Sequence, residues 1–520
     1  MEIIVGWKRR FILLCLFVFF GSAQTGAQTD SLSNLFRNAY SVFELLRNDK
    51  GIYRDSKVFN GTDFHPSSVA SIGMGLISIC IAEEMGWIND GAGQVITTLK
   101  SITGQNPFFR PDRNPTGYFR HWIDMNTGVR AWNSEYSTID SGILLCGALF
   151  CQRYFCDNEE INNLVNTLWQ SIDWSKAIQD PTTGGIYLEM LENGEGKENA
   201  ITLPFNEYMI VSWLAMHQEK EKGISGKATQ LWQNHYARPI DLPIRTYQGI
   251  AVLTDSPNHY LSSFVVQFPY YLCHYFSSDS TYLDFFRQAR QADRAWWSRQ
   301  FNADPQQWGL GAGSANNGSG YLATAINNNP AKIYSPQIIA GFLPVAPTDT
   351  VDLLNLNRNK QGLYTLPFSQ NQILWRKSLT DPTWVAPEVQ GVDYSTMLFG
   401  LASLPRFLGN AFFETYNDFF GTPCNQLTSL SVREKGNFII SLFPNPVQDE
   451  IQVSLENLSR DPLTIQMLNQ SGAPVFIREI NIHNSALRTS VDLSGMPAGI
   501  YFLKVRQRER IHVEKVIFQH

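Results

Sequence analysis

The stretch RAWNSEYSTIDSGILLCGALF, residues 130–150, decides how the rest of the chain is interpreted. It carries two carboxylates, Glu135 and Asp140, beside a tryptophan and just before a run with almost no polar residues. Ser137 is a good helix N-cap, and Asp140 follows three residues later, where a capping box places an acid. Apolar and small residues then recur at helical spacing. The stretch predicts a buried helix, and it leaves open whether the carboxylates cap that helix or do chemistry.

The same pattern returns along the chain as a long, loosely kept repeat. Mostly apolar runs begin at residues that can cap a helix, between 56 and 73 positions apart: Ser67, Ser137, Asn206, Ser262, Ser335 and Asp393. Most of these runs are followed by a second, more charged stretch with helical spacing, as in NEEINNLVNTLWQSI after the second run. A helix that is apolar all round is buried, whereas a helix with a polar face lies outside.

Six buried helices alternating with about six amphipathic ones predict an all-α (α/α)6 toroid, or barrel, over residues 28–420. Because an outer helix returns the chain between successive inner helices, the inner N-termini gather at one end of the barrel. Four acids would then face one cavity: Glu135, Asp140, Glu207 and Asp393. Each acid taken alone is also explained as a helix cap or a partner of the helix dipole.

Aromatic residues favour a carbohydrate site at this end of the barrel. Trp122, Trp132, Trp308 and Trp384 fall in the loops and helix starts that would surround the acids. Aromatic faces stack on sugars, and carboxylates supply acid and base, so the combination is typical of a site for a poly- or oligosaccharide. The alternative for each tryptophan is ordinary core filling.

The two ends of the chain differ from this barrel. Lys8, Arg9 and Arg10, then FILLCLFVFF and small residues, predict a secretory signal peptide over residues 1–27, whose apolar run is too short to span a bilayer. Residues 421–437 have no helical period and are interpreted as a linker. Short alternating runs broken by turn residues then predict a small all-β immunoglobulin-like sandwich over residues 438–520.

Charge and composition exclude several classes of partner. The formal net charge is -6, and basic residues cluster only at Lys504, Arg506, Arg508 and Arg510, which we interpret as a solvated strand edge. Without a basic face, nucleic acid is not an expected partner. Neither CxxC nor HExxH occurs and the nine His are scattered, so we expect no metal and no cofactor. We expect the protein to be a monomer.

Four blocks carry a resemblance to a known family: GYFRHWIDMNTGVRAWNSEYSTIDSGILLCGALFCQRYF (117–155), FNEYMIVSWLAM (205–216), WGLGAG followed by SGY (308–321) and APEVQGVDYSTMLFG (386–400). They resemble the glucoamylase-like bacterial family that includes the endo-β-1,2-glucanases. The likeness spans roughly residues 32–405. Its most specific part is D-x-x-T-G-x-R-x-W-x-x-E-x-S-T-I-D, from Asp124 to Asp140.

The resemblance implies an (α/α)6-barrel, anomer-inverting glycoside hydrolase that acts on a β-glucan or related glycan. By that likeness the catalytic acids are Glu135, Asp140, Glu207 and Asp393, and which two serve as acid and base stays open. Residues assigned to substrate binding are Trp122, Asp124, Arg130, Trp132, Trp308, Tyr321 and Trp384.

Departures from the family pattern bear on the substrate. The loop after Trp308 lacks the usual Asp-Gly-Pro, the fourth inner helix starts with Ser262–Val265 in place of a polar, His-rich segment, and Tyr394 replaces a Gln. We expect these positions to line the cavity. Two alternatives therefore stay open: a toroid polysaccharide lyase, and a glycan-binding protein that has lost catalysis.

The last domain shows a second resemblance. FPNPVQDEIQV (443–453) and DLSGMPAGIYFLKV (492–505) are similar to motifs of the C-terminal sorting domain of the type IX secretion route. That likeness implies the type IX machinery as a partner and a location outside the cell or on the outer-membrane surface, after periplasmic export. The alternative is a carbohydrate-binding module, but an exposed aromatic strip is missing.

Overall fold

The computed structural model describes residues 31–238, 243–300, 302–316, 320–421 and most of 439–519. In the last segment it leaves out 444–446, 457, 459–460, 470–472, 483–485 and 508–509. The chain divides into two compact units, Met1–Cys424 and Asn425–His520. The predicted signal peptide, and the predicted linker after Gly421, lie outside the described residues. Of the helices described, none has the length and apolar character needed to cross a membrane.

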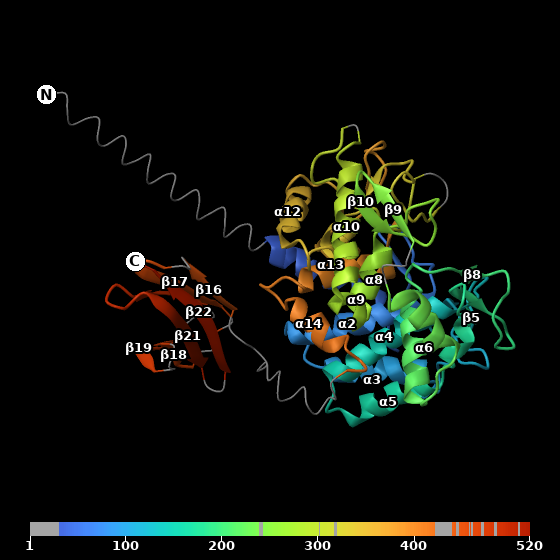
Figure 1. The fold of residues 1–520 in the computed structure, drawn as a ribbon, viewed down its shortest axis with the longest axis horizontal. Helices are drawn as coiled ribbons and strands as arrows, with labels where there is room; N and C mark the ends of the chain where they lie inside the picture. The colour runs from blue at the N-terminus through green and yellow to red at the C-terminus, as the bar shows by residue number, and fades with distance from the viewer. Residues whose placement is uncertain are drawn as a thin grey trace. The chain divides into compact units, whose positions relative to one another are not determined.

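Inner helices form a closed ring in the first unit. In its described part they are α2 Val69–Glu84, α4 Thr138–Tyr154, α6 Met209–Glu221, α8 Phe264–Leu272, α11 Pro336–Gly341 and α13 Gly391–Ala402. Each packs against the next, and α13 packs against α2 (Figure 1). All six predicted apolar runs thus supply one wall each of a helical toroid.

Outer helices cover this ring and bury one face each. They are the helix over residues 31–46, α3 Gly91–Ile102, α5 Glu159–Gln170, α7 Lys227–Leu231 with the π-helical turn Trp232–Tyr236, α10 Ser280–Trp297 and α12 Thr350–Arg358. In α5, Leu164 and Leu168 are buried, whereas Glu159 and Glu160 start the helix on its solvent side. Shorter helical pieces are α9 His274–Ser278, α14 Asn410–Tyr416 and the 3-10 turns Trp174–Ala177 and Pro347–Asp349.

Glycine allows the closest helix approaches in the ring. A β-carbon on Gly147 of α4 would collide with the backbone of Gly73 in α2, and one on Gly400 of α13 would collide with the carbonyl of Ala340 in α11. The backbones of these neighbouring helices therefore touch, and the small residues in the apolar runs are required by packing.

Four of the six predicted helix caps are wrong. The helices α2 and α8 have Ser68 and Ser263 at their N-caps, each one residue after the predicted Ser67 and Ser262. The helix α6 starts after Tyr208, because the Asn206 side chain accepts the Tyr208 N–H in a local turn and does not cap the helix. The helix α13 starts directly after strand β15 with Gln390 at its N-cap, so Asp393 is the third helical residue. Ser137 does cap α4, accepting the backbone N–H of Asp140 at 3.2 Å.

Short antiparallel strands connect the helices. Pairs are β1 Ser56–Val58 with β15 Glu388–Gln390, β2 Ser67–Ser68 with β3 Trp122–Ile123, β4 Tyr136–Ser137 with β7 Glu189–Met190, β9 Ile244–Tyr247 with β10 Ile250–Leu253, β11 Ile333–Tyr334 with β14 Lys377–Ser378, and β12 Leu363–Thr365 with β13 Gln372–Leu374. A three-stranded sheet holds β5 Ile178–Asp180, β6 Gly185–Tyr187 and β8 Ile201–Thr202. The β1–β15 pair joins the two ends of the toroid sequence.

The second unit contains two antiparallel sheets in its described part. The strands are β16 Ile439–Phe443, β17 Glu450–Glu456, β18 Leu463–Leu468, β19 Pro474–Ile480, β20 Ala486–Asp492, β21 Gly499–Gln507 and β22 Arg510–Phe518. The order is β16-β17-β20 in one sheet and β19-β18-β21-β22 in the other, and one hydrophobic cluster contains residues of both. Lys504 and Arg506 lie on β21, an inner strand, so the prediction of a strand edge is wrong for them, whereas Arg510 lies on the edge strand β22.

Candidate active site

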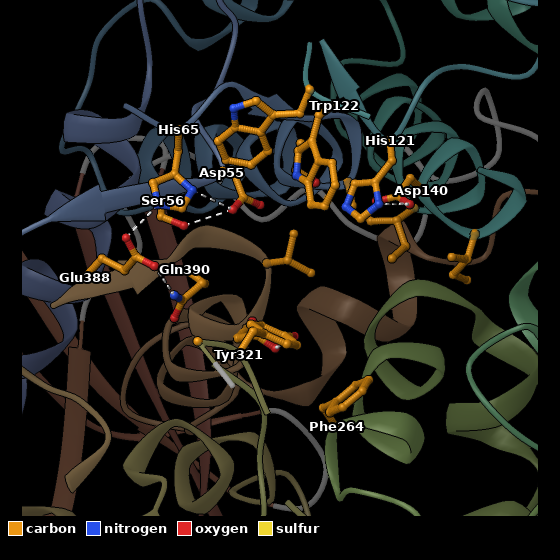
Figure 2. Close-up of a pocket in the computed structure, with 18 of the residues that line it drawn as sticks. Asp55, Ser56, His65, His121, Trp122, Asp140, Phe264, Tyr321, Glu388 and Gln390 are labelled. Carbon is orange, nitrogen blue, oxygen red and sulfur yellow. Dashed lines mark hydrogen bonds and ion pairs between the residues drawn. The ribbon is translucent and has the colours of Figure 1, made fainter. Parts of the chain in front are cut away.

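A cavity of about 700 Å³ opens where the inner helices begin. Its lining includes the first turns of α2, α4, α8 and α13, the residue Glu207 just before α6, and the strands β1 and β15 (Figure 2). The size is that of a site for a small molecule or a short oligosaccharide. Five of the six inner helices therefore bring residues at or near their starts to one place, as the repeat pattern predicts, whereas α11 contributes no residue to the lining.

Six of the predicted site residues line this cavity: Asp140, Glu207, Asp393, Trp122, Trp132 and Tyr321. Glu135 contacts the cavity indirectly, through His121. The remaining four, Asp124, Arg130, Trp308 and Trp384, lie elsewhere, as described below.

Asp393 is buried, accepts a hydrogen bond from a hydroxyl and lies in the field of a buried guanidinium. The Tyr321 hydroxyl lies 3.2 Å from each carboxylate oxygen of Asp393 and donates to it. Burial raises the pKa of Asp393 to about 7, although the charge of the buried Arg376 and the Tyr321 hydrogen bond both act to lower it. Asp393 is therefore a carboxyl whose pKa lies near neutrality and whose charged form is stabilised by one hydrogen bond and by the charge of Arg376.

Glu207 also titrates near neutrality but has different surroundings. Burial raises its pKa to about 7, and the nearby charge of Asp255 adds to the increase. Among the described residues, no side chain donates a hydrogen bond to its carboxylate and no cation pairs with it. The local environment favours the protonated form of Glu207.

A histidine and two acids form the His121 cluster, made of His121, Glu135 and Asp140. The Nδ1 atom of His121 lies 2.9 Å from Glu135 Oε1 and 3.8 Å from Asp140 Oδ2. Burial acts to lower the pKa of His121, but the charges of Asp140 and Glu135 outweigh it and raise the pKa to about 9. His121 is therefore an imidazolium at neutral pH that orients two carboxylates.

The backbone and the side chain of Asp140 have different roles. Ser137 caps the helix through the Asp140 N–H, but the Ser137 N–H donates to the Phe119 carbonyl, so the return bond of a capping box is not made. The Asp140 carboxylate instead lines the cavity beside His121, and burial raises its pKa. The residue starts a helix with its backbone and faces the site with its side chain.

A second group, the His65 cluster of His65, Asp55 and Glu388, was not predicted from the sequence. His65 Nε2 lies 2.7 Å from Glu388 Oε2, and its Nδ1 lies 3.6 Å from Asp55 Oδ2. Burial acts to lower the pKa of His65, but Asp55 and Glu388 raise it to about 9. Gln390 donates to Glu388 at 3.0 Å, which fixes the outer carboxylate.

The His65 cluster could not be predicted from the sequence because it depends on pairing between two strands that are distant in the chain. Its acids come together through the β1–β15 pair, in which Val58 is opposite Glu388 and Ser56 is opposite Gln390. No motif spans that separation. For His121 a signal was available, because it lies inside the GYFRHW block and immediately precedes Trp122.

Aromatic rings form the rim above these clusters. Trp132 is half exposed with a left-handed backbone (φ 53°), and its ring is in edge contact with Trp122 at 5.1 Å and His65 at 5.4 Å. Phe64 lies beside them and is 66% exposed. A non-glycine residue in this conformation is uncommon and occurs often at functional sites. The rim offers apolar faces to a ligand entering the cavity.

Four predicted substrate contacts lie away from the cavity lining. Trp308 is buried in the ring wall, where its indole N–H donates to Asp352 at 2.9 Å, so its role there is packing. Asp124 accepts the Thr127 N–H and shapes a turn. The exposed guanidinium of Arg130 donates a hydrogen bond to the Asn133 side chain. The Trp384 ring is partly buried and packs against the hydrophobic core. Loop and wall positions next to a site cannot be told from lining positions by sequence alone.

One departure from the family pattern is also misplaced. Tyr394 is buried and packs edge-on against Trp375, at 5.6 Å between ring centroids, and it is not part of the lining. Phe264, in contrast, lines the cavity as expected, and Gly320 and Tyr321 from the altered loop do as well.

Among the described residues, no group of three or more His, Cys, Asp or Glu could hold a metal ion.

The arrangement can therefore perform acid–base chemistry on a neutral ligand. Two carboxyls with pKa values near 7 face one cavity, Asp393 from the first turn of α13 and Glu207 from the segment just before α6. Near neutral pH, one carboxyl of such a pair can be protonated and donate a proton while the other is ionised and accepts one.

Comparison with solved structures shows the fold of the first unit. A protein described as a "putative glucoamylase" from Bacteroides uniformis is 17% identical with a TM-score of 0.62, over 77% of this chain and 95% of that one. The endo-β-1,2-glucanase of Chitinophaga pinensis, in complex with sophorotriose and glucose, is 16% identical with a TM-score of 0.62, over 77% and 96%. The β-1,2-glucanase of Parabacteroides distasonis is 17% identical with a TM-score of 0.61, over 76% and 59%.

The helical unit is thus a toroid of the kind found in glucoamylase-like proteins and endo-β-1,2-glucanases. In the second unit, residues 441–519 match the family described as "Secretion system C-terminal sorting domain". The search of curated proteins found no match.

Proposed function

We propose that the protein is a secreted glycoside hydrolase that cleaves a β-glucan, with a β-1,2-linked glucan as the first substrate to test. The observation that carries this proposal is the pair Glu207 and Asp393: two carboxyls in one cavity, each with a pKa raised by burial to about 7. The aromatic rim and the glucanases that share the fold support a sugar substrate.

Glu207 is the better general acid and Asp393 the better general base. An acid must hold its proton until bond cleavage, and the surroundings of Glu207 favour the protonated form. A base must be ionised, and the Tyr321 hydroxyl and the Arg376 charge favour the carboxylate of Asp393. The two acids left open by the sequence motifs, Glu135 and Asp140, then act through His121.

The reaction follows from these roles. Glu207 gives its proton to the glycosidic oxygen as the bond from that oxygen to the anomeric carbon breaks. Water adds to the anomeric carbon and gives a proton to Asp393, so the products are two hydroxyl-bearing fragments. Proton exchange with solvent restores both carboxyls. Direct attack by water inverts the anomeric configuration, which is the stereochemistry that the family resemblance implies.

Product analysis tests this proposal. The purified protein is incubated with a panel of linear glucans that includes the β-1,2-linked one, and products are followed by chromatography and proton NMR. We expect shortened glucans whose new reducing ends first appear with the α configuration. Unsaturated products absorbing in the ultraviolet would instead indicate a lyase, and binding without any release of sugar would indicate a glycan-binding protein.

The second unit supports export by the type IX route. We propose that the protein passes the inner membrane by the predicted signal peptide, 1–27, and the outer membrane by the C-terminal domain, both of which are then removed. Mass spectrometry of native protein should find a start near residue 24 or 28 and an end between Gly421 and Asn437. An intact His520 on most of the secreted protein would contradict this processing.

A further inference from the structure

The floor of the cavity is apolar. Ile139 and Ile143 of α4 line it, as do Phe264 and Phe268 of α8. The two phenyl rings are 5.2 Å apart between centroids and tilted by 45°. No hydroxyl, amide or charge is contributed by these four positions.

These residues lie at two depths. Ile143 follows Ile139 by four residues, and Phe268 follows Phe264 by four, which is about one helical turn, or roughly 6 Å along the axis. Because α4 and α8 begin at the cavity and run away from it, Ile143 and Phe268 form its deeper layer. Both are almost fully buried, so the deeper layer is closed to solvent from behind.

The apolar floor is next to one of the two reactive carboxyls. In the ring, α6 packs against both α4 and α8, which carry the two isoleucines and the two phenylalanines, and Glu207, two residues before α6, lines the same cavity as these four side chains. In the His65 cluster, Asp55 directly precedes β1 and Glu388 lies on β15, which leads directly into α13, the helix that carries Asp393. Figure 2 shows Phe264 across the cavity from His65 and Glu388.

A sugar ring does not fit this floor well. Sugar hydroxyls need hydrogen-bond partners when they leave water, and the floor supplies none. Aromatic rings alone would be consistent with sugar stacking, but aliphatic Ile139 and Ile143 offer no flat face for it. The polar His65 cluster, in contrast, has carboxylate and amide groups suited to hydroxyls.

We propose that the cavity binds an amphiphilic glycoside, with the sugar toward the His65 cluster and an apolar alkyl or aryl group on the floor beside Glu207. This inference rests on the proposed function, because it places the apolar group on the leaving-group side, next to the acid. The substrate class is then a β-glucoside, or short β-glucan, joined to an apolar alcohol or phenol. The bond cleaved and the proton transfers are those given above.

Binding of an alkyl series tests the proposal apart from catalysis. Methyl, butyl, hexyl and octyl β-glucosides are titrated into the Glu207→Gln variant by calorimetry. Each methylene that enters an apolar site should tighten binding by about fourfold, which corresponds to about 0.8 kcal/mol per buried CH₂, until the floor is filled. Equal affinity across the series overturns the proposal.

Polar substitutions of the floor sharpen the test. Ile143→Thr and Phe264→Ser, each combined with Glu207→Gln, should flatten the increase with chain length while methyl glucoside binds about as before. Val95→Thr, at a buried position of α3 outside the cavity, is the control for loss of stability and should keep the full increase. If affinity still rises with chain length in both floor variants, the proposal is overturned. It is also overturned if the rise is lost in the Val95→Thr control.

Hydrolysis of the same series by the unsubstituted protein separates this proposal from the proposed function. Rising kcat/KM with chain length supports both. Hydrolysis at a rate independent of chain length overturns the apolar subsite and leaves the hydrolase standing. If affinity rises with chain length but no glycoside or glucan is cleaved, the hydrolase fails and the apolar site stands.

Discussion

The Glu207 side and the Asp393 side of the cavity are built from different chemistry, although each holds a carboxyl whose pKa is raised to about 7. Asp393 accepts a hydrogen bond from a tyrosine hydroxyl at 3.2 Å, and the charge of a buried arginine also favours its anion. Glu207 has no such side-chain partner among the described residues; the lining that it shares includes isoleucine and phenylalanine side chains from α4 and α8, and the charge of Asp255 is nearby.

The comparison teaches that similar pKa values can arise from opposite environments. At Asp393 burial is partly offset by a side-chain hydroxyl and a cation, whereas at Glu207 only its own backbone N–H opposes burial. A neighbouring acid raises the pKa at both sites, Asp55 at Asp393 and Asp255 at Glu207. A base needs the first environment and an acid the second. The roles can therefore be assigned from surroundings where the pKa values alone would not separate them.

The largest expected effect comes from removing either carboxyl. Glu207→Gln and Asp393→Asn should each lower kcat on a glucan by about 10²–10⁴-fold, because general acid and base catalysis have that magnitude. Melting temperatures should not fall, since both residues are near-isosteric replacements. Glu160→Gln on the outer helix α5 is the matched control and should keep full activity. Wild-type turnover in both cavity variants would remove the catalytic interpretation.

The next effect concerns stability against pH. Because the folded-state pKa of Glu207 is raised from 4.5 to about 7, its contribution to stability is complete below pH 4.5 and is lost as pH rises through 7. Glu207→Gln does not titrate there. Between pH 4.5 and 8 the variant should therefore gain relative stability, by up to roughly 3 kcal/mol. Denaturant unfolding at several pH values measures it, and parallel curves would mean that Glu207 is not buried in this way.

A smaller effect is expected on the Asp393 side. Tyr321→Phe removes a hydrogen bond to the carboxylate, which is worth about 1.5–3 kcal/mol, so the pKa of Asp393 should rise by about one to two units. The acidic limb of the kcat/KM profile then moves to higher pH, whereas a purely structural loss would lower the whole profile. Tyr247→Phe on β9 is the control and should leave the profile unchanged.

The smallest expected effect tests whether the Asp140 carboxylate only helps to start α4 or also acts in the cavity. Asn is a tolerated residue near a helix start, so Asp140→Asn should leave the melting temperature nearly unchanged. Because the Asp140 charge is the strongest of those that raise the pKa of His121, that pKa should fall from about 9. NMR titration of the histidine measures it. An unchanged His121 titration would show that Asp140 acts only as part of the helix start.

Much of the fold follows from local patterns in the sequence. Runs such as residues 67–82 are apolar on every face, and only burial inside a ring satisfies them, so the six inner helices were predictable. The starts of the helices were harder to predict. Gln390 is the N-cap of α13 because strand β15 ends there and α13 follows directly, and local propensity does not reveal that strand pairing.

The site was predictable where one block of sequence holds it. Asp140 and Trp132 lie in one motif, whereas Asp55 and Glu388 meet only because β1 pairs with β15. Trp308 shows the opposite error. A tryptophan beside a motif glycine predicts a sugar platform, but its indole N–H is bound to Asp352 within the wall. Burial of a single side chain depends on neighbours that are distant in sequence.

The most direct test of the account compares leaving groups in the two variants. A 2,4-dinitrophenyl β-glucoside needs no proton to release its phenol, whereas an alkyl β-glucoside does. If Glu207 is the acid and Asp393 the base, Glu207→Gln should lose activity on the alkyl glucoside and keep most of it on the dinitrophenyl glucoside. Asp393→Asn should lose activity on both. Equal losses for the two substrates in Glu207→Gln, or rescue by the dinitrophenyl group in Asp393→Asn, would contradict the assignment.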